Sequence, residues 1–505
     1  MSKWNTRAIV LAAGRSTRFK TKKTKLLFNI CGRSMVLYPL KALEALGIPM
    51  TIVLGYQAEE VRKEIEAAHI PQASYVIQKE QRGTGHAVAC SQDTWDQDTI
   101  LILYGDVPLL TEELIEALLS EHHATSSVVT FCTSFMLDPT GYGRVIEEDN
   151  GFRIVEERNC SPEELLISKI NAGIYAVNRK FLTDAIAKLY SNEITGEIYL
   201  VDIVKMACDQ GLPVRTFSVP YDNVRGVNTL QELWSVEQIK RSEFIRYWMS
   251  EGVRFELAQS IHIDINVKIG AGSFIGTGVH LLGNTVIGEE CFVGAFTIIE
   301  NTTIGNYTNI HSHSVIQDSK IGCDVHVGPF ARLRHQVELG NEVLIGNFVE
   351  VKATKVGDQT LTKHLTYLGD AIIGKEVNIG AGTIICNYDG IQKRQTVIDD
   401  HAFIGSNNTL IAPLHIGKGA YTAGGSTITE NVPAGSLAIG RSKQELKAGY
   451  AKKVLEKTPS TLVNNAEENE EPSTSIQKNQ HTFDGQEDEV FNFQGALKSE
   501  NERNL

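Results

Sequence analysis

The sequence lacks any run of about 18 apolar residues, the length that a helix needs to cross a bilayer. The segment MSKWNTRAIV at its start also lacks the apolar core of a signal peptide. The eight cysteines are scattered singly and no two form a CxxC pair, so neither a zinc site nor a disulfide framework is indicated. We therefore expect a soluble protein of a reducing compartment, the cytoplasm.

Dense clusters of basic residues are also missing. The net charge of −13 argues against a nucleic-acid-binding surface as the main function. The hydrophobic fraction of 42% and the charged fraction of 22% are typical of a globular protein. A chain of 505 residues is long enough for two or three domains, each with its own core.

Residues 1–228 alternate short apolar runs with amphipathic segments. The runs AIVLAAG, MTIVLGY, TILILYGDVPLL and SVVTFCTSF are separated by helical patterns such as VLYPLKALEALG and EELIEALLSEHH. This alternation predicts an α/β domain with a mainly parallel sheet and crossover helices. Ligands of such sheets bind at the carboxyl ends of the strands, which is where LAAGRSTRF and YGDVP fall.

The rest of the chain shows three different sequence patterns. Residues 229–255 contain little Gly or Pro and predict a linker helix. From Ile261 onward, aliphatic–Gly pairs recur six residues apart, for example at Ile269-Gly270 and Ile275-Gly276. This period predicts a parallel β-helix of hexapeptide repeats over residues 256–448. Residues 449–505 form an arm and a polar, acidic tail that we expect to be disordered.

The motifs of both predicted domains occur in a characteristic order: LAAGRSTRF, QKEQRGTGHA, YGDVP, VRGVN, KHLTYLGD and NIGAGTIICNYDG. With the domain order, they resemble the GlmU family, the bifunctional enzymes of UDP-N-acetylglucosamine synthesis. The resemblance covers roughly residues 6–445. It implies a Rossmann-like nucleotidyltransferase domain followed by a left-handed parallel β-helix. The chain departs from the family signature at Ser16, where the family has glycine, at Phe19 (methionine) and at Thr24 (proline).

Several N-terminal residues have the chemistry that a nucleotidyl transfer needs. The LAAGRSTRF turn offers backbone N–H groups, with Arg15 and Arg18, to a triphosphate, and Ser16 adds its hydroxyl. Asp106 ends an apolar strand, where a carboxylate is a good Mg²⁺ ligand, although aspartate is also common in turns. Lys25 can neutralise phosphate, but in its basic run it can also be a solvated surface lysine.

The resemblance assigns these residues more closely. It implies catalytic roles for Arg18 and Lys25, Mg²⁺ as the cofactor and Asp106 and Asn228 as its ligands. His86 is interpreted as structural. The implied UTP and UDP-N-acetylglucosamine site consists of Leu11, Ala12, Ala13, Gly14, Lys25, Gln78, Gly83, Thr84, Tyr104, Gly105, Asp106, Gly143, Glu156, Asn171 and Asn228.

Three stretches interrupt the hexapeptide pattern: GPFARLR, NFVEVKATK and KHLTYLGD. An imidazole titrates in the range needed to deprotonate an amine, and the resemblance makes His364 the general base. The implied sugar-phosphate site consists of Arg334, Lys352, Tyr367 and Asn378. The implied acetyl-CoA site consists of Ala381, Asn387, Tyr388, Lys393, Ser406, Gly424 and Arg441.

The resemblance implies two reactions. The β-helix would transfer acetyl from acetyl-CoA to glucosamine-1-phosphate, and the N-terminal domain would transfer uridyl from UTP to N-acetylglucosamine-1-phosphate. It also implies a homotrimer with acetyltransferase sites between subunits, and neither a nucleic-acid partner nor stable membrane association.

Two alternatives remain at this point. A non-catalytic assembly subunit has the same outline, but such a subunit would be expected to lose Asp106, Asn228, Lys25 and His364. An enzyme with only one active half is the other alternative, and the departures at Ser16 and Thr24 would make the uridyltransferase the weaker half.

Overall fold

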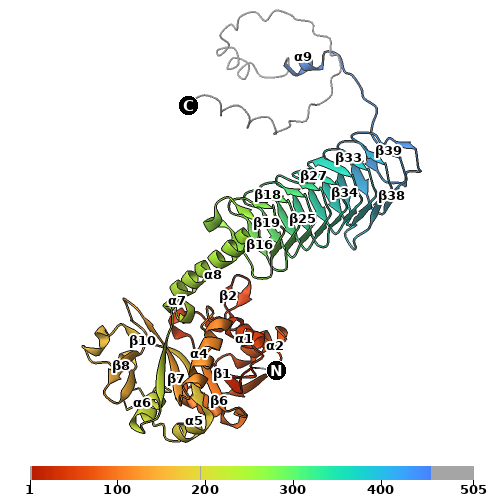
Figure 1. The fold of residues 1–505 in the computed structure, drawn as a ribbon. Helices are drawn as coiled ribbons and strands as arrows, with labels where there is room; N and C mark the ends of the chain where they lie inside the picture. Colours follow the sequence, from red (N-terminus) through yellow and green to blue (C-terminus); the bar gives the residue numbers. More distant parts are fainter. Residues whose placement is uncertain (1–2, 194, 456–505) are drawn as a thin grey trace, which may run out of the picture. The chain divides into compact units, whose positions relative to one another are not determined.

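The computed structural model describes residues 3–193 and 195–455 (Figure 1). The chain divides into two compact units, Met1–Arg441 and Ser442–Leu505. The first unit contains the predicted nucleotidyltransferase domain and the β-helix. In the second unit the described residues include one helix, α9 (Tyr450–Leu455). The predicted acidic tail beyond Leu455 lies outside the described residues.

The N-terminal domain is built on one nine-stranded sheet whose main path runs β11-β7-β10-β6-β1-β4-β5. Pairing is parallel except at β10, which is antiparallel to β6 and β7, and in the β8–β9 hairpin. This confirms the predicted Rossmann-like α/β class. The strands are β1 (Thr6–Ala12), β4 (Met50–Leu54), β5 (Ala73–Ile77), β6 (Thr99–Tyr104), β7 (Val129–Phe135), β8 (Arg144–Glu148), β9 (Gly151–Val155), β10 (Lys169–Asn178) and β11 (Val214–Ser218).

Helices cover both faces of this sheet. Successive side chains of a strand point to opposite faces, so Ala8 and Val10 of β1 pack with α1 and α4, whereas Ile9 and Leu11 pack with α3, α5 and α6. The helices are α1 (Leu37–Ala45), α2 (Ala58–Ala67), α3 (Thr84–Cys90), α4 (Glu112–Ala124), α5 (Arg179–Ile186), α6 (Asp202–Asp209) and α7 (Tyr221–Val224). Shorter elements are the 3-10 turns η1 (Thr17–Phe19) and η2 (Lys25–Leu27) and the hairpin β2 (Asn29–Ile30) to β3 (Arg33–Ser34).

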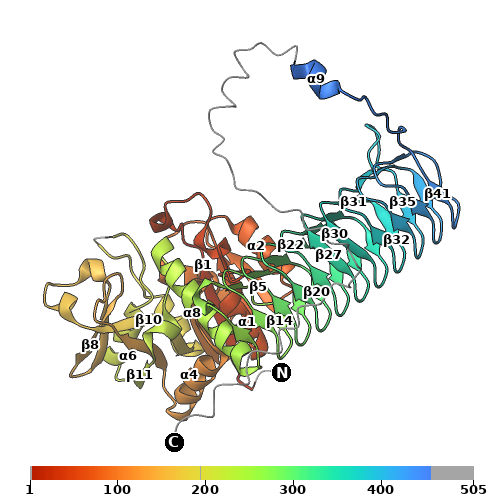
Figure 2. The ribbon, with the colours of Figure 1, turned by 90° about the horizontal axis from the view of Figure 1, so that it is seen from above.

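The β-helix consists of three parallel sheets, here named sheets I, II and III, each taking one strand per coil (Figures 1 and 2). Sheet I holds β12 (Arg254–Phe255), β15 (Phe274–Ile275), β18 (Phe292–Val293), β21 (Asn309–Ile310), β24 (His326–Val327), β27 (Leu344–Asn347), β30 (Leu361–His364), β33 (Asn378–Ile379), β36 (Phe403–Ile404), β39 (Tyr421–Thr422) and β41 (Leu437–Ala438). Sheet II holds β13 (His262–Ile263), β16 (His280–Leu282), β19 (Ile298–Glu300), β22 (Val315–Gln317), β25 (Arg332–Arg334), β28 (Glu350–Lys352), β31 (Tyr367–Gly369), β34 (Ile384–Cys386), β37 (Thr409–Ile411) and β40 (Thr427–Ile428). Sheet III holds β14 (Lys268–Ile269), β17 (Val286–Ile287), β20 (Thr303–Ile304), β23 (Lys320–Ile321), β26 (Glu338–Leu339), β29 (Lys355–Val356), β32 (Ala371–Ile373), β35 (Thr396–Ile398) and β38 (Leu414–Ile416).

The predicted hexapeptide pattern describes the core of this domain. The aliphatic residue of each aliphatic–Gly pair points inward and stacks on its counterpart in the next coil, as Ile275 does on Val293. The glycine that follows lies where neighbouring coils come close together. A Cβ on Gly270 would lie 2.5 Å from the backbone of Gly288. The predicted parallel β-helix is therefore confirmed, with one apolar core along its whole length.

The three stretches that interrupt the repeat in the sequence remain regular strands. Arg334 of β25 pairs with Lys352 of β28, and Lys352 pairs with Gly369 of β31. The predicted site residues Arg334, Lys352 and Tyr367 are therefore held in the register of sheet II, and His364 ends strand β30 of sheet I.

The predicted linker helix of residues 229–255 is too long. Helix α8 covers Leu230–Ser250, and Arg254–Phe255 already form the first strand of sheet I. A capping box between Thr229 and Glu232 starts the helix. It ends shortly before Gly252, whose φ of +86° is left-handed and typical of a helix terminus.

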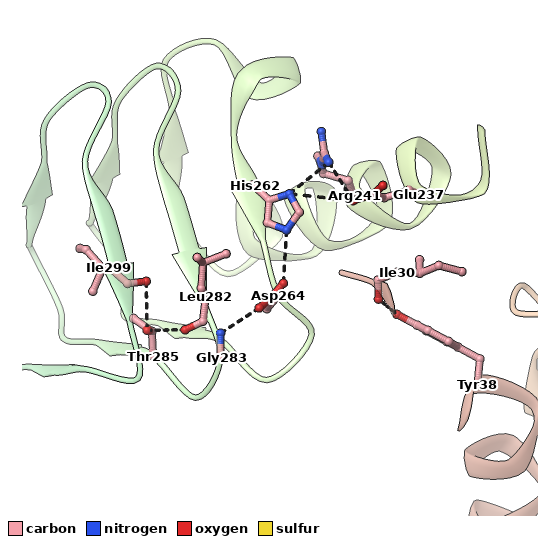
Figure 3. Close-up of polar contacts among 10 residues, drawn as sticks. All are labelled: Ile30, Tyr38, Glu237, Arg241, His262, Asp264, Leu282, Gly283, Thr285 and Ile299. Atoms are coloured by element: carbon pink, nitrogen blue, oxygen red, sulfur yellow. Dashed lines mark hydrogen bonds and ion pairs between the residues drawn. The ribbon is translucent and has the colours of Figure 1, made fainter. Parts of the chain in front are cut away.

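Helix α8, the first coil and the β2–β3 hairpin meet at a polar junction (Figure 3). The His262 ring lies between Arg241 of α8, at 3.1 Å, and the Asp264 carboxylate, at 3.3 Å. Asp264 also accepts from the Gly283 N–H at 2.8 Å, and the Ile265 N–H donates to the Cys31 carbonyl at 3.0 Å. A backbone bond thus ties the hairpin to the first coil, and side-chain bonds tie α8 to the same coil.

Among the described residues, no helix is both long and apolar enough to cross a membrane.

We expect Ile304→Ala to destabilise the β-helix by about 2–5 kcal/mol, since its side chain is buried in the stack and its loss leaves a cavity. Thr303→Ala, an exposed neighbour in the same strand, is the control and should change stability by less than about 0.5 kcal/mol. Urea unfolding of the two variants measures the difference. Equal midpoints would contradict the inward packing of Ile304.

Candidate active sites

The first site lies at the carboxyl ends of β1 and β6. Leu11 and Tyr104 are paired across these strands, and the Gly105 N–H donates to the Leu11 carbonyl at 3.0 Å. Leu11, Ala12 and Ala13 are buried, whereas Gly14 emerges at the surface. The predicted phosphate loop therefore begins at the edge of the sheet where the sequence placed it.

Four predicted residues converge beyond this edge, although they come from three separate segments. The Lys25 ammonium forms an ion pair with the Asp106 carboxylate and donates to the Asn228 side-chain oxygen at 2.8 Å. The Arg18 guanidinium donates to the same Asn228 oxygen at 2.7 Å. The Val227 N–H donates to the Asp106 carbonyl at 3.0 Å, which holds the last segment against the end of β6.

The oxygen atoms of this cluster fit a hard divalent cation. The Asp106 carboxylate and the Asn228 amide oxygen both contact one ammonium group, so their oxygens face a common point. Mg²⁺ prefers oxygen ligands and is commonly held by one or two protein groups together with substrate phosphates. The Asp106 carboxylate and the Asn228 amide oxygen are two such oxygen ligands, and they leave the other coordination positions to substrate phosphates.

A cavity of ≈ 230 Å³ adjoins the cluster. It is lined by residues of β6 and β10, by the segments that flank the β8–β9 hairpin, and by the loop that carries Asn228. The predicted residues in its wall are Arg18, Tyr104, Asp106, Gly143, Glu156, Asn171 and Asn228. The cavity thus brings the predicted metal ligands and the predicted sugar-binding positions together.

Glu156 lies in the wall of this cavity and also of a second one, of ≈ 190 Å³, lined by polar side chains such as Tyr199 and Asp202. Burial, together with the neighbouring carboxylates of Glu197 and Asp202, raises the pKa of Glu156. Burial also raises the pKa of Asp202. The sheltered end of the site therefore disfavours negative charge, as suits a neutral sugar.

The segment predicted to recognise uracil does not line either cavity. Gln78 is buried, and its amide nitrogen donates to the Gly83 carbonyl at 3.1 Å and contacts the His86 ring at 3.0 Å. The Thr84 hydroxyl accepts from the Leu200 N–H at 3.1 Å. His86, interpreted as structural, thus has a partner within its own segment.

In the β-helix, His364 is held by the neighbouring coil. It ends β30 and pairs with Asn347 of β27. The His364 Nδ1 lies 2.8 Å from the Asn347 side-chain oxygen. Because an amide oxygen only accepts hydrogen bonds, Nδ1 carries the proton and Nε2 is left as the basic nitrogen. The ring is exposed, so that nitrogen is accessible.

A charged column runs along sheet II beside these residues. Arg334 donates to Glu350 at 2.7 Å. Lys352 is buried next to Arg334, and its ammonium lies 3.2 Å from the Asp370 carboxylate. The side chain of Asn387 donates to the same carboxylate. Asp370 therefore joins a predicted sugar-phosphate residue to a predicted acetyl-CoA residue.

The residues predicted to bind acetyl-CoA fall into two groups. Lys393 comes from the loop between β34 and β35, and its contact with Lys352 lowers the pKa of Lys393. It therefore lies beside Lys352, one of the predicted sugar-phosphate residues. Tyr388, in the same loop, is exposed and donates to the Gly390 carbonyl at 2.7 Å.

The second group lies at a corner of successive coils. The Ala381 carbonyl accepts from the Asn407 N–H at 2.6 Å, and the Ser406 carbonyl accepts from the Gly425 N–H at 2.8 Å, next to Gly424. Arg441 follows the last coil and is exposed.

The two remaining predicted residues lie on two different sheets of the β-helix. Tyr367 is in β31 of sheet II, and Asn378 is in β33 of sheet I, paired with Leu361 of the strand that ends at His364.

Comparison with known proteins agrees with this geometry. The family described as a MobA-like NTP transferase domain matches residues 8–147, and the family described as the GMPPB C-terminal domain matches residues 257–358. The bifunctional protein GlmU of Clostridioides difficile is 41% identical over 458 residues, covering 90% of this chain and 99% of the relative. GlmU of Alkaliphilus metalliredigens is 40% identical, with 88% and 97% covered, and GlmU of Pelobacter propionicus is 41% identical, with 90% and 100% covered.

The chain belongs to the bifunctional GlmU family. The predicted family, and with it the class of bifunctional enzymes of UDP-N-acetylglucosamine synthesis, is confirmed. The alternative of a non-catalytic assembly subunit is therefore dropped.

Within this GlmU-family chain, the structure adds residues that the sequence analysis did not single out. Asn347 contacts His364, and Asp370 contacts both Lys352 and Asn387. Asp370 ends the quoted motif KHLTYLGD, so its position next to a functional segment was a signal. Asn347 begins the quoted stretch NFVEVKATK and so had a similar signal, but its partner His364 lies one full coil away.

We expect Glu156→Gln to stabilise the N-terminal domain at neutral pH. Because the pKa of Glu156 is raised in the folded state, its ionisation opposes folding. That destabilisation is absent below the unfolded pKa of about 4.3, grows as the pH rises from there toward the folded pKa, and stays constant above the folded pKa. The gain from the substitution should therefore be present at pH 7 and vanish near pH 4 in thermal unfolding.

The control for this substitution is Glu147→Gln in the same hairpin. A hydrogen bond from Lys169 lowers the pKa of Glu147, so its replacement should give no gain at pH 7. A Glu156→Gln variant that is equally or less stable at pH 7 would contradict the raised pKa.

Proposed function

We propose that the cluster at the end of β6 transfers a uridyl group from UTP to N-acetylglucosamine-1-phosphate. The contact of Lys25 and Arg18 with the Asp106–Asn228 pair, beside a cavity of ≈ 230 Å³, is the observation that carries this proposal. The predicted sugar-binding residues Gly143, Glu156 and Asn171 line the same cavity.

In this reaction the phosphate of N-acetylglucosamine-1-phosphate attacks the α-phosphorus of UTP in line, and pyrophosphate leaves. Lys25 and Arg18 stabilise the negative charge that develops on the transferred and leaving oxygens. Leu11, Ala12, Ala13 and Gly14 lead into the turn that receives the triphosphate, while Gln78, Gly83 and Thr84 recognise uracil.

Asp106 and Asn228 would hold Mg²⁺, which when bound supplies charge neutralisation of the phosphates. Tyr104 and Gly105 support these ligands from the end of β6, where Gly105 is bonded to Leu11.

We further propose that the β-helix acetylates glucosamine-1-phosphate. Nε2 of His364 removes a proton from the amine while the amine nitrogen attacks the thioester carbonyl carbon of acetyl-CoA. The C–S bond breaks, and CoA leaves as the thiol after it takes up that proton, while Asn347 holds the ring through Nδ1. Arg334 and Lys352 bind the sugar phosphate, and Tyr367 and Asn378 bind the sugar. The acetyl-CoA side is formed by Ala381, Asn387, Tyr388, Lys393, Ser406, Gly424 and Arg441.

The product of acetylation is the acceptor of uridyl transfer, so the two reactions follow each other. Their final product, UDP-N-acetylglucosamine, is a precursor of peptidoglycan and lipopolysaccharide. We propose a homotrimer with acetyltransferase sites between subunits. The eight cysteines are free thiols, which supports the predicted cytoplasmic location.

A coupled assay with glucosamine-1-phosphate, acetyl-CoA, UTP and Mg²⁺ tests both activities, with CoA thiol and pyrophosphate followed separately. EDTA should abolish pyrophosphate release and leave CoA release nearly unchanged, because only uridyl transfer is proposed to need the metal. Restoration by added Mg²⁺ is the control. Equal loss of both products would contradict two independent sites.

His364→Ala should lower CoA release by about 10²-fold or more, the range expected for a general base. Pyrophosphate release from supplied N-acetylglucosamine-1-phosphate should continue at the wild-type rate. His415→Ala is a matched control, since His415 is an exposed β-helix histidine that contacts Asp399 instead. A His364→Ala variant with full acetyl transfer would remove this residue from the mechanism.

A further inference from the structure

Two residues at which this chain departs from the GlmU-family signature meet in the structure. The hydroxyls of Ser16 and Thr24 lie 3.5 Å apart. The Ser16 hydroxyl also accepts from the backbone N–H of Lys25 at 3.2 Å. This hydroxyl was predicted to contact the phosphate, whereas in the structure it contacts the turn that carries the proposed catalytic lysine.

Ser16 holds this position in a strained conformation. Its φ of 54° and ψ of 34° lie in the left-handed region, which glycine adopts freely and other residues adopt at a cost of roughly 1 kcal/mol. A glycine here would relieve the strain but would leave the Lys25 N–H without this acceptor. Strain of this kind persists where the surrounding contacts require it.

Thr24 compensates for the missing proline in a similar way. Its φ of −61° is close to the value that a proline ring imposes. Unlike proline, Thr24 has an N–H group, and it donates to the Gln57 side-chain oxygen at 2.7 Å. Gln57 is itself left-handed, with φ of 52°. Two strained residues thus supply the acceptors for the two successive N–H groups of Thr24 and Lys25.

We propose that Ser16 is a positioning residue for Lys25, and that the hydrogen bonds which Ser16 and Gln57 accept from the N–H groups of Lys25 and Thr24 replace the covalent restraint of a proline before the lysine. The ordered turn η2 then directs the Lys25 ammonium to Asp106 and Asn228. This inference rests on the proposed uridyl transfer. It also accounts for how a chain with both departures keeps its N-terminal site intact.

Four variants test the proposal in the full chain. Ser16→Ala removes the hydroxyl and should lower kcat/KM for UTP about 5-fold, the value of one hydrogen bond. Ser16→Gly should lose as much activity yet unfold at the same or a higher temperature, because it also removes the strain. Ser16→Thr keeps the hydroxyl on a branched side chain, so it should be less stable but retain more activity than Ser16→Gly.

The fourth variant is a rescue. Adding Thr24→Pro to Ser16→Ala should return kcat/KM for UTP to within about 2-fold of wild type, because proline fixes φ at residue 24 without a hydrogen bond. Acetyl transfer, measured in the same preparations, should stay at the wild-type rate in all four.

The outcomes separate this inference from the function on which it rests. Wild-type protein that acetylates but releases no pyrophosphate would contradict the proposed uridyl transfer and the role of Lys25 with it. If the wild-type protein releases pyrophosphate and the Ser16→Ala and Ser16→Gly variants release it at the same rate, the role of Ser16 is overturned and the proposed uridyl transfer is not. The role of Ser16 would also be overturned if activity fell only in step with thermal stability.

Discussion

The β-helix depends on one constraint, which is that a single coil cannot bury its own inward side chains. Its strands are two to four residues long, too short to be stable alone, and each gains its hydrogen bonds and its apolar contacts from the coils on either side. The register between coils is therefore fixed along the whole domain. This fixed register also places the side chains of the proposed acetyltransferase site, since Asn347 lies opposite His364 and Arg334 lies opposite Lys352 for the same reason that Ile275 lies opposite Val293.

The N-terminal domain organises its site by different means. Its strands end at one edge of the sheet, and the polar residues that follow them are held by charge compensation as well as by backbone. Lys25 and Arg18 share the oxygens of Asp106 and Asn228 within one cluster. In the proposed reaction the negative charge of a triphosphate pairs with these two cations. The cations are therefore paired both before and after the triphosphate binds, so neither is left uncompensated in a partly buried site.

The sequence predicted the structure best where a regular spacing of apolar residues determines it. Inward residues such as Ile269 and Ile287 follow from the six-residue spacing, and Asp106 follows from its place after an apolar strand. The end of α8 was harder to predict, because helical patterning continues past Ser250 and only Gly252 marks the change. The contact of Asp370 with Lys352 could not be predicted, since it joins neighbouring coils. The same holds for Ser16, whose partner depends on how the chain returns at Lys25.

The long coil between Ile379 and Ile404 shows what a stacked coil can tolerate. Its additional residues, including Tyr388 and Lys393, leave at a corner between β34 and β35, and both strands still pair with the coils before and after them. Insertions at corners therefore add chemistry without disturbing the stack, whereas an insertion inside a strand would turn inward side chains outward. Whole coils can be gained or lost in the same way, each changing the length of the domain by about 4.8 Å. Two kinds of length change therefore preserve the stack, which are an insertion at a corner and the gain or loss of one complete coil.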